Sequence, residues 1–164
     1  MDINLKEEVL QFLCMAASKH DPRSLERAYL KIGDQAIWGA AKTNRMESIV
    51  AHTLMDALGK NGVPPHWREA HDATQRQISA YLSELDRVAG RLAKEGIALI
   101  ALKNGGIARG IFPCAGCCPM GDLDVLVDKQ RFREAHRILI EDGFLFKFRS
   151  PLEKEDLQSA EREG

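Results

Sequence analysis

The fold of this chain is decided by residues 119–127, which read PMGDLDVLV. The run that follows the second aspartate is apolar, as in a buried strand, and a proline and a glycine stand just before the first aspartate. Side chains two residues apart on a strand lie on the same face. A strand over residues 122–127 therefore places the carboxylates of Asp122 and Asp124 side by side.

Two neighbouring carboxylates repel each other unless a cation or protons lie between them. Mg²⁺ (or Mn²⁺) is the natural occupant, because it takes hard oxygen ligands and keeps coordination positions for phosphate. Two such ions can align an attacking hydroxyl with a leaving pyrophosphate. An Asp-x-Asp sequence is a weak signal by itself, so the hypothesis of a metal site depends on the surrounding residues.

A glycine pair, Gly105 and Gly106, lies upstream, after the apolar run of residues 97–102 that predicts a first buried strand. Bare backbone at such a turn can approach a triphosphate, and the N–H groups of a following helix can bind it. Lys103 and Arg109 flank the turn and can neutralise phosphate charge. A tight strand-to-helix turn without any ligand needs the same glycines, so both interpretations stay open.

The first half of the chain has apolar residues at helical spacing, interrupted by glycine and proline. This pattern predicts helices over residues 5–16, 24–32, 34–42, 46–58 and 67–92. The last is long enough for a coiled coil, but a spine packed against its neighbours is the favoured interpretation. Trp38 and Trp67 lie on apolar stripes and are expected in the core.

Beyond residue 127, the sequence predicts one more helix and one more strand. Asp128 caps the helix, Gly143 ends it, and phenylalanines then alternate with other residues over 144–148. The predicted fold class is α+β, with a helical region (1–95), a small mixed-sheet core of strand-helix-strand-helix-strand order (96–150) and a polar tail (151–164).

The overall composition excludes several classes of protein. The 164 residues carry a net charge of −1, which does not suit a protein that coats nucleic acid. No apolar run approaches the ~20 residues of a membrane span, and the acidic start does not resemble a secretion signal. Four cysteines, three of them crowded together, make no disulfide framework. These features predict a cytoplasmic protein without a membrane partner.

The crowded cysteines are Cys114, Cys117 and Cys118. They supply at most three of the four ligands of a zinc site, at awkward spacing, and His136 is the nearest downstream histidine. The five histidines share no local spacing that suggests ligation. Inert loop thiols and structural or solvated histidines are therefore expected.

Three segments together resemble the bacterial, uncharacterised nucleotidyltransferase family of the polymerase-beta-type superfamily. They are residues 102–108 (LKNGGIA), residues 119–127 and the EDGF sequence of residues 141–144. With the helical leader before them, the resemblance covers about residues 33–148. Its combined pattern is fairly specific.

The resemblance implies a mixed sheet with helices on one face and transfer of a nucleoside monophosphate from an NTP. Asp122 and Asp124 would bind the catalytic Mg²⁺ (or Mn²⁺). Gly105 and Gly106 would contact the phosphates, with Lys103 close by. The implied acceptor is a small molecule or a protein, and nucleic acid is not expected as a partner.

The chain departs from the family pattern at three points. The motif glycine falls at Asn104, with the glycine pair shifted by one place, and Cys118 replaces an arginine. The third carboxylate expected on a later strand is missing from residues 144–148, and the acids at Glu153, Glu155 and Asp156 lie in the polar tail. Either the domain is truncated or the acid is lost.

Two rival functions follow from these departures. The first is a truncated or degenerate nucleotidyltransferase fold that binds a nucleotide or a protein partner. The second is a helical interaction module in which Asp122 and Asp124 only face solvent. A further acidic strand would separate an enzyme from the first rival.

Overall fold

The computed structural model describes residues 3–18 and 21–145. The chain folds mostly into helices, with one small antiparallel strand pair, so the α+β class is confirmed. In chain order the elements are α1 (Ile3–Ala16), α2 (Pro22–Ile32), α3 (Asp34–Thr43), α4 (Glu47–Leu58), η1 (Lys60–Gly62), α5 (Pro65–Ala93), β1 (Leu99–Ala101), α6 (Lys103–Ile111), η2 (Ala115–Cys117), β2 (Val125–Val127), η3 (Lys129–Arg131) and α7 (Phe132–Glu141).

The five helices of the first half begin and end within a few residues of the predicted bounds. Local signals explain this agreement. The Asp21 carboxylate accepts a hydrogen bond of 3.0 Å from the amide of Ser24 and so caps α2. Gly33 and Gly96 follow helix ends with φ of 91° and 69°, a left-handed conformation that favours glycine.

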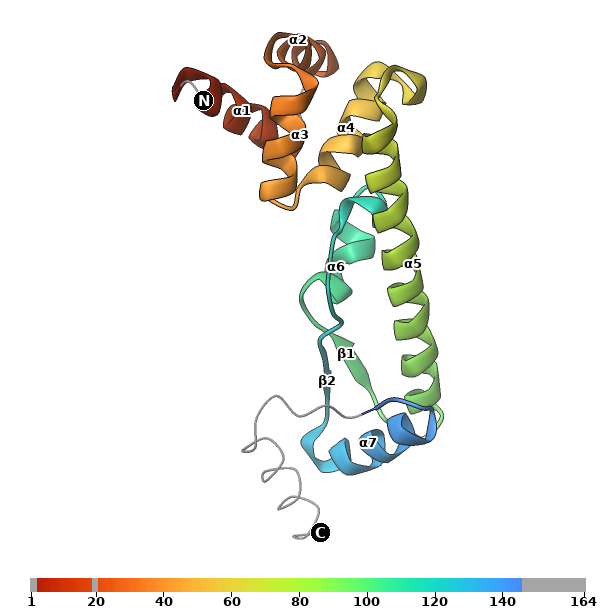
Figure 1. The fold of residues 1–164 in the computed structure, drawn as a ribbon. Coiled ribbons are helices and arrows are strands. Elements are labelled where there is room, and N and C mark those ends of the chain that lie inside the picture. Colours follow the sequence, from red (N-terminus) through yellow and green to blue (C-terminus); the bar gives the residue numbers. More distant parts are fainter. Residues whose placement is uncertain (1–2, 19–20, 146–164) are drawn as a thin grey trace.

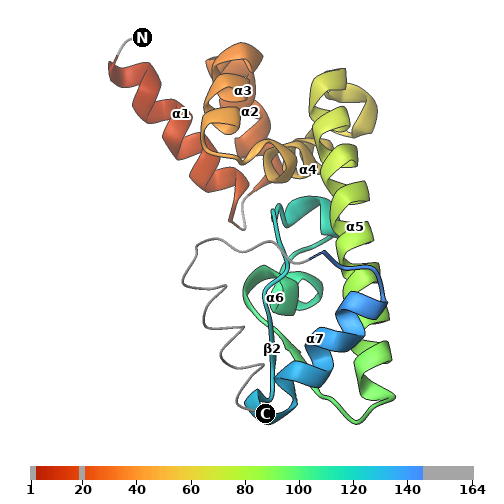
Figure 2. The ribbon, with the colours of Figure 1, turned by 60° about the horizontal axis from the view of Figure 1, so that its bottom comes forward.

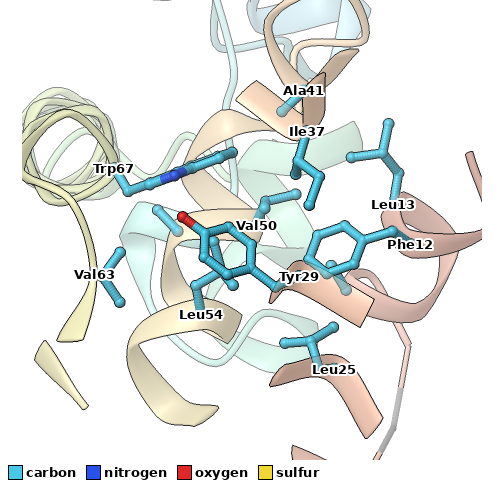
Figure 3. Packing of buried hydrophobic residues seen from close by; sticks show 12 residues of the cluster. Phe12, Leu13, Leu25, Tyr29, Ile37, Ala41, Val50, Leu54, Val63 and Trp67 are labelled. Atoms are coloured by element: carbon cyan, nitrogen blue, oxygen red, sulfur yellow. The ribbon is translucent and has the colours of Figure 1, made fainter. Parts of the chain in front are cut away.

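The helices α1–α4 enclose the first apolar cluster with the start of α5 (Figures 1 and 3). Trp67 of α5 is fully buried there, beside Tyr29 of α2 and Leu54 of α4. Trp38 is partly buried and packs on the same cluster, which confirms that both tryptophans belong to the core.

One carboxylate organises the polar edge of this cluster. Asp34 accepts hydrogen bonds from the Tyr29 hydroxyl at 2.6 Å and from the Trp67 indole nitrogen at 2.7 Å. Burial by itself raises the pKa of Asp34, but these two hydrogen bonds and the nearby His66 together outweigh it, and the pKa lies below its usual value. The two large aromatic side chains are therefore held in one arrangement by a charged acceptor.

Helix α5 is the spine of the molecule, as predicted. It runs along the whole length of the described fold, from the helical half to α7 (Figures 1 and 2). Its middle residues Ile78, Leu82 and Leu85 pack with α6 and the loop after it, and its last turns pack with Ile138 of α7. Because one helix contributes to all three apolar clusters, the two halves share a single rigid element.

Strands β1 and β2 are shorter than predicted. They pair antiparallel, with Leu99 opposite Val127 and Ile100 opposite Leu126. Leu99 and Val127 pack toward α5 and α7, whereas Ile100 and Leu126 are more than half exposed. The expectation of a buried first strand is therefore met on one face alone, because helices cover that face of the ribbon and no described element covers the other.

The third predicted strand, residues 144–148, lies largely outside the described residues, and Phe144 and Leu145 have no regular structure. The mixed-sheet, five-element core thus stays a prediction, as does the division at residues 95 and 150. The helix before it is confirmed, with Asp128 capping η3 and Gly143 ending α7 at a φ of 92°. No helix in the described ranges is both long enough and apolar enough to cross a bilayer.

Candidate functional site

The two aspartates line one pocket of about 300 Å³ beside the start of α6. They lie just before β2 and not within it, although the Leu102 amide donates a 2.9 Å hydrogen bond to the Asp124 carbonyl. The other walls come from residues 102–105 and 119–121. The structure therefore brings together the two segments that the sequence singles out.

Lys103 closes one side of this pocket. Its ammonium nitrogen lies 2.7 Å from a carboxylate oxygen of Asp124. The backbone of Lys103 has a φ of 49°, a left-handed conformation that costs a residue with a side chain roughly 1–2 kcal/mol. The pocket thus holds two carboxylates and one ammonium, which leaves a net negative charge that favours a cation.

The segment that leads to Asp122 is held on both sides. The Tyr81 hydroxyl of α5 donates a 3.3 Å hydrogen bond to the Gly121 carbonyl. The Asn104 side-chain amide donates one of 3.3 Å to the Pro119 carbonyl. Asn104 therefore ties the two walls of the pocket together.

The glycine pair lies inside the first turn of α6, not in a turn before it. Gly105 lines the pocket, and a Cβ there would lie 3.2 Å from the Leu123 side chain. A Cβ on Gly106 would lie 2.6 Å from the Ala101 carbonyl oxygen, which is backbone and cannot turn away. The close approach expected at this pair exists, and at Gly106 the partner is the protein's own strand. Contact with phosphate stays a prediction for both.

Replacement of Gly106 by alanine should destabilise the fold by about 1–3 kcal/mol, because the new methyl group forces β1 and α6 apart. Gly110 of the same helix offers a matched control, since a Cβ there meets nothing within 4 Å. Gly110→Ala should leave stability unchanged or raise it by up to about 1 kcal/mol. Urea unfolding followed by circular dichroism measures both. Equal stability of the two variants would contradict the close packing of α6 on β1.

Two residues near the motifs lie outside the pocket. Arg109 binds Asp86 of α5 through both guanidinium nitrogens, at 2.9 and 2.7 Å, and this pairing raises the pKa of Arg109. It is six residues beyond Lys103, or about 240° around the helix, so it faces α5 and not the aspartates. Cys118 is fully buried in the cluster between α5 and α6. Neither side chain is placed to contact a phosphate in this pocket.

A second described pocket, of about 350 Å³, lies between α1 and α3. Lys6 is the one charged residue in its lining, which is otherwise neutral. A cavity without a carboxylate offers no ligand for Mg²⁺. A further described pocket, lined by Asp21, Arg23, Glu26 and Arg27, has carboxylates but is remote in sequence from the motifs. The pocket beside the aspartates is the candidate site because it has carboxylates and is lined by both motif segments.

The structure brings together a second group of side chains, which sequence reasoning did not assemble. His52 and His71 meet Cys114 and Cys117 in space, with their ligand-type atoms all within 4.8 Å of one another. The expectation of inert loop thiols and structural or solvated histidines did not foresee this meeting, because the histidines come from 62 and 43 residues before Cys114. The unusual crowding of three cysteines beside the aspartate motif is the one signal that pointed to this place.

Comparison with known proteins extends these observations. No curated protein and no solved structure gave a match. The model of a protein family described as "Uncharacterised nucleotidyltransferase" matches residues 31–163, and it supports nucleotidyl transfer, with a nucleotide as substrate, as the general class of activity. Since the match extends over well more than half of the sequence, the chain belongs to this uncharacterised nucleotidyltransferase family.

Proposed function

We propose that this protein is a Mg²⁺-dependent (or Mn²⁺-dependent) nucleotidyltransferase of the polymerase-beta type, similar to the bacterial family that its motifs resemble. It moves a nucleoside monophosphate from an NTP to a small-molecule or protein acceptor. The observation that carries the proposal is the meeting of Asp122, Asp124 and Lys103 at the start of α6, in one pocket.

The residues present fit a hard divalent cation. The two carboxylates supply oxygen ligands, and the pocket borders hold no histidine or cysteine among the described residues. With two protein carboxylates, Mg²⁺ keeps several positions for water and phosphate oxygens. When bound, the cation supplies charge neutralisation at the phosphates of the nucleotide.

Lys103 has two roles in this proposal, one without a bound cation and one with it. Its ammonium group neutralises Asp124 when no cation is present, at 2.7 Å. A divalent cation held by the carboxylates would take the place of the ammonium group, and Lys103 would then neutralise phosphate charge instead of Asp124. The side chain of Lys103 is 77% exposed, so it can move without disturbing the core.

The start of α6 completes the phosphate subsite. The residue before this helix, Leu102, makes no capping hydrogen bond through its side chain to the first turn. Amides in the first turn of a helix bind anions, and the partial positive charge of the helix start adds to the attraction. Gly105 lines the pocket without a side chain and leaves the backbone accessible.

Calorimetry with Mg²⁺ and each non-hydrolysable NTP tests the proposal. The double variant Asp122→Asn/Asp124→Asn should bind nucleotide roughly 100-fold more weakly or not at all, because it loses two charged ligands. Asp56→Asn, which removes an exposed carboxylate from α4, is the control and should bind like the original protein. Nucleotide binding by the double variant at the original affinity would refute the site.

Lys103→Gln separates the two roles of the lysine in the same experiment. Nucleotide affinity should fall by about tenfold, the equivalent of one charged contact of about 1.4 kcal/mol. Affinity for Mg²⁺ alone should not fall, since the substitution removes a competing cation. Weaker binding of Mg²⁺ alone would show that Lys103 organises the aspartates instead of contacting phosphate.

A nucleotide-binding or protein-binding module is the second candidate. In the part of the chain that the structure describes, no third carboxylate lines the pocket. Such a site holds a nucleotide with its metal but lacks a group that takes the proton of the acceptor.

A further inference from the structure

A cluster of two imidazoles and two thiols lies where α4, α5 and η2 meet. His52 comes from α4 and His71 from α5. Cys114 directly precedes the short η2 turn, and Cys117 is its last residue. Cys117 is fully buried, and the other three side chains are partly buried. None of these four residues lines the aspartate pocket, whose walls come from residues 102–105, 119–122 and Asp124.

All four ligand atoms lie within 4.8 Å of one another, and the three separations from the Cys114 sulfur are near those around a tetrahedral ion, with the two sulfurs slightly closer than such an ion would hold them. The Cys114 sulfur lies 3.3 Å from the Cys117 sulfur, 3.3 Å from the His71 Nε2 atom and 3.8 Å from the His52 Nδ1 atom. Bonds of about 2.3 Å to sulfur and 2.0–2.1 Å to nitrogen place tetrahedral ligands roughly 3.3–3.8 Å apart. A four-coordinate ion therefore fits with small adjustments of the side chains.

The backbone is shaped to bring the two cysteines onto His71. Gly116, between them, passes across the imidazole, and a Cβ there would lie 2.8 Å from its Cδ2 and Cε1 atoms and closer still to Nε2. The Gly116 amide donates a 2.7 Å hydrogen bond to the Gln75 side chain, one helical turn beyond His71. The turn is thus fixed on α5 by contacts of its own, which preorganises the four ligands.

The Nδ1 atom of His71, which points away from the cysteines, has surroundings that are common around a metal-bound histidine. This nitrogen is buried without a hydrogen-bond partner, and a carboxylate oxygen of Asp72 lies 3.6 Å away. Metal-bound histidines commonly donate their other N–H to a carboxylate, which orients the ring and raises its basicity. When Nε2 binds a metal, Nδ1 carries the proton and faces this acceptor.

We propose that His52, His71, Cys114 and Cys117 bind one Zn²⁺ in a closed, structural site. Two sulfurs and two nitrogens in a tetrahedron suit zinc among the common metals. Each thiol releases its proton to solvent on binding, so two thiolates and two neutral imidazoles leave the site uncharged, and no redox step is involved. Four protein ligands leave no open position for a substrate.

The metal would clamp the loop that leads to the aspartates. Cys117 and Asp122 are five residues apart, which is at most about 18 Å of chain. The site joins this loop to α4 of the helical half and to α5, the spine. Zinc therefore fixes one end of the segment whose other end carries Asp122 and Asp124.

Titration of the reduced, metal-free protein with Co²⁺ tests the proposal, with Zn²⁺ added afterwards as competitor. One equivalent of Co²⁺ should give the intense visible bands of a tetrahedral ion and a thiolate charge-transfer band, and Zn²⁺ should abolish both. X-ray absorption at the zinc edge of the original protein should show two sulfurs and two nitrogens at the distances above. This measurement needs no variant and so does not depend on whether a variant folds.

Cys118 provides the matched control, because it lies in the same loop but is buried in an apolar cluster. Cys118→Ser should bind one equivalent of Co²⁺ or Zn²⁺ with the original affinity. Cys117→Ser should bind the metal roughly 100-fold more weakly or worse, because it loses a direct ligand and not a residue that only orients one. Three results would overturn the proposal: no Co²⁺ or Zn²⁺ bound by the reduced protein, an octahedral spectrum, or unchanged affinity in Cys117→Ser.

Discussion

Removal of zinc should lower the melting temperature of this protein by roughly 8–16 °C. A ligand present at a thousand times its Kd stabilises the folded state by about 4 kcal/mol, and each kcal/mol shifts the melting temperature of a chain of this size by about 2–4 °C. The effect should be large because the proposed site joins three segments, α4, α5 and η2, at one point. Scanning calorimetry with and without a zinc chelator measures the shift.

The controls separate loss of zinc from other effects of the chelator. Cys114→Ser, which lacks one ligand, should melt at a lower temperature and should not respond to the chelator. Cys118→Ser places a hydroxyl in an apolar cluster and is expected to be less stable, yet its response to the chelator should match that of the original protein. A chelator shift of the same size in Cys114→Ser would show that the stabilising metal binds elsewhere.

Turnover of NTP by this chain should be slow in comparison with its binding of nucleotide. Loss of a general base typically lowers the rate by ~10²–10⁴-fold and leaves ground-state contacts to phosphate intact. Asp122 and Asp124 are the acidic residues of the described pocket, and both are needed as metal ligands in the proposed function. Nothing in the described lining is then left to accept the proton of an attacking hydroxyl.

Incubation with each radiolabelled NTP, Mg²⁺ and a bacterial lysate as the source of acceptors tests this prediction. Label transfer and pyrophosphate release should remain low at nucleotide concentrations that saturate binding, and the Asp122→Asn/Asp124→Asn variant should remove what transfer there is. Glu153, Glu155 and Asp156 lie outside the described residues. Fast turnover that disappears on alanine substitution at one of these acids would show that the tail supplies the third carboxylate and that the site is a complete enzyme.

The distinction between an enzyme and a binding module depends on the two experiments together. Metal-dependent nucleotide binding with slow turnover favours the module, and binding with fast turnover favours the transferase. The helical interaction module requires Asp122 and Asp124 only to face solvent. Their position in one pocket with Lys103 gives no support to that third reading.

The helical half was predictable to within a few residues because its signals are local. A carboxylate that caps α2, a left-handed glycine after α2 and the apolar stripe of α5 each act over one or two helical turns. The prediction for Asp122 and Asp124 also depends on neighbouring residues alone. Side chains two residues apart in an extended segment lie on the same face, so a short stretch of sequence is enough to make it.

The shorter strands and the exposed outer face of the ribbon could not be predicted in this way. An apolar run indicates that a segment is able to be buried, but the elements that cover it are chosen by the rest of the fold. Ile100 and Leu126 are as apolar as Leu99 and Val127, yet they are exposed because the helices pack on the other face. Likewise, Gly106 meets the Ala101 carbonyl only because α6 folds back against β1.

The sequence by itself therefore determined the helices and their ends, and it singled out the two aspartates that line one pocket, since each of these signals depends on neighbours within a few residues. Only the tertiary structure decided that Arg109 binds Asp86 and that His52 and His71 meet Cys114 and Cys117. The side chains of that second set are up to 62 residues apart, and their separation is set by the way α4 and α5 pack together. The spacing of apolar residues along a chain does not determine the angle at which two helices cross. The proposed zinc site is therefore visible only in the folded molecule.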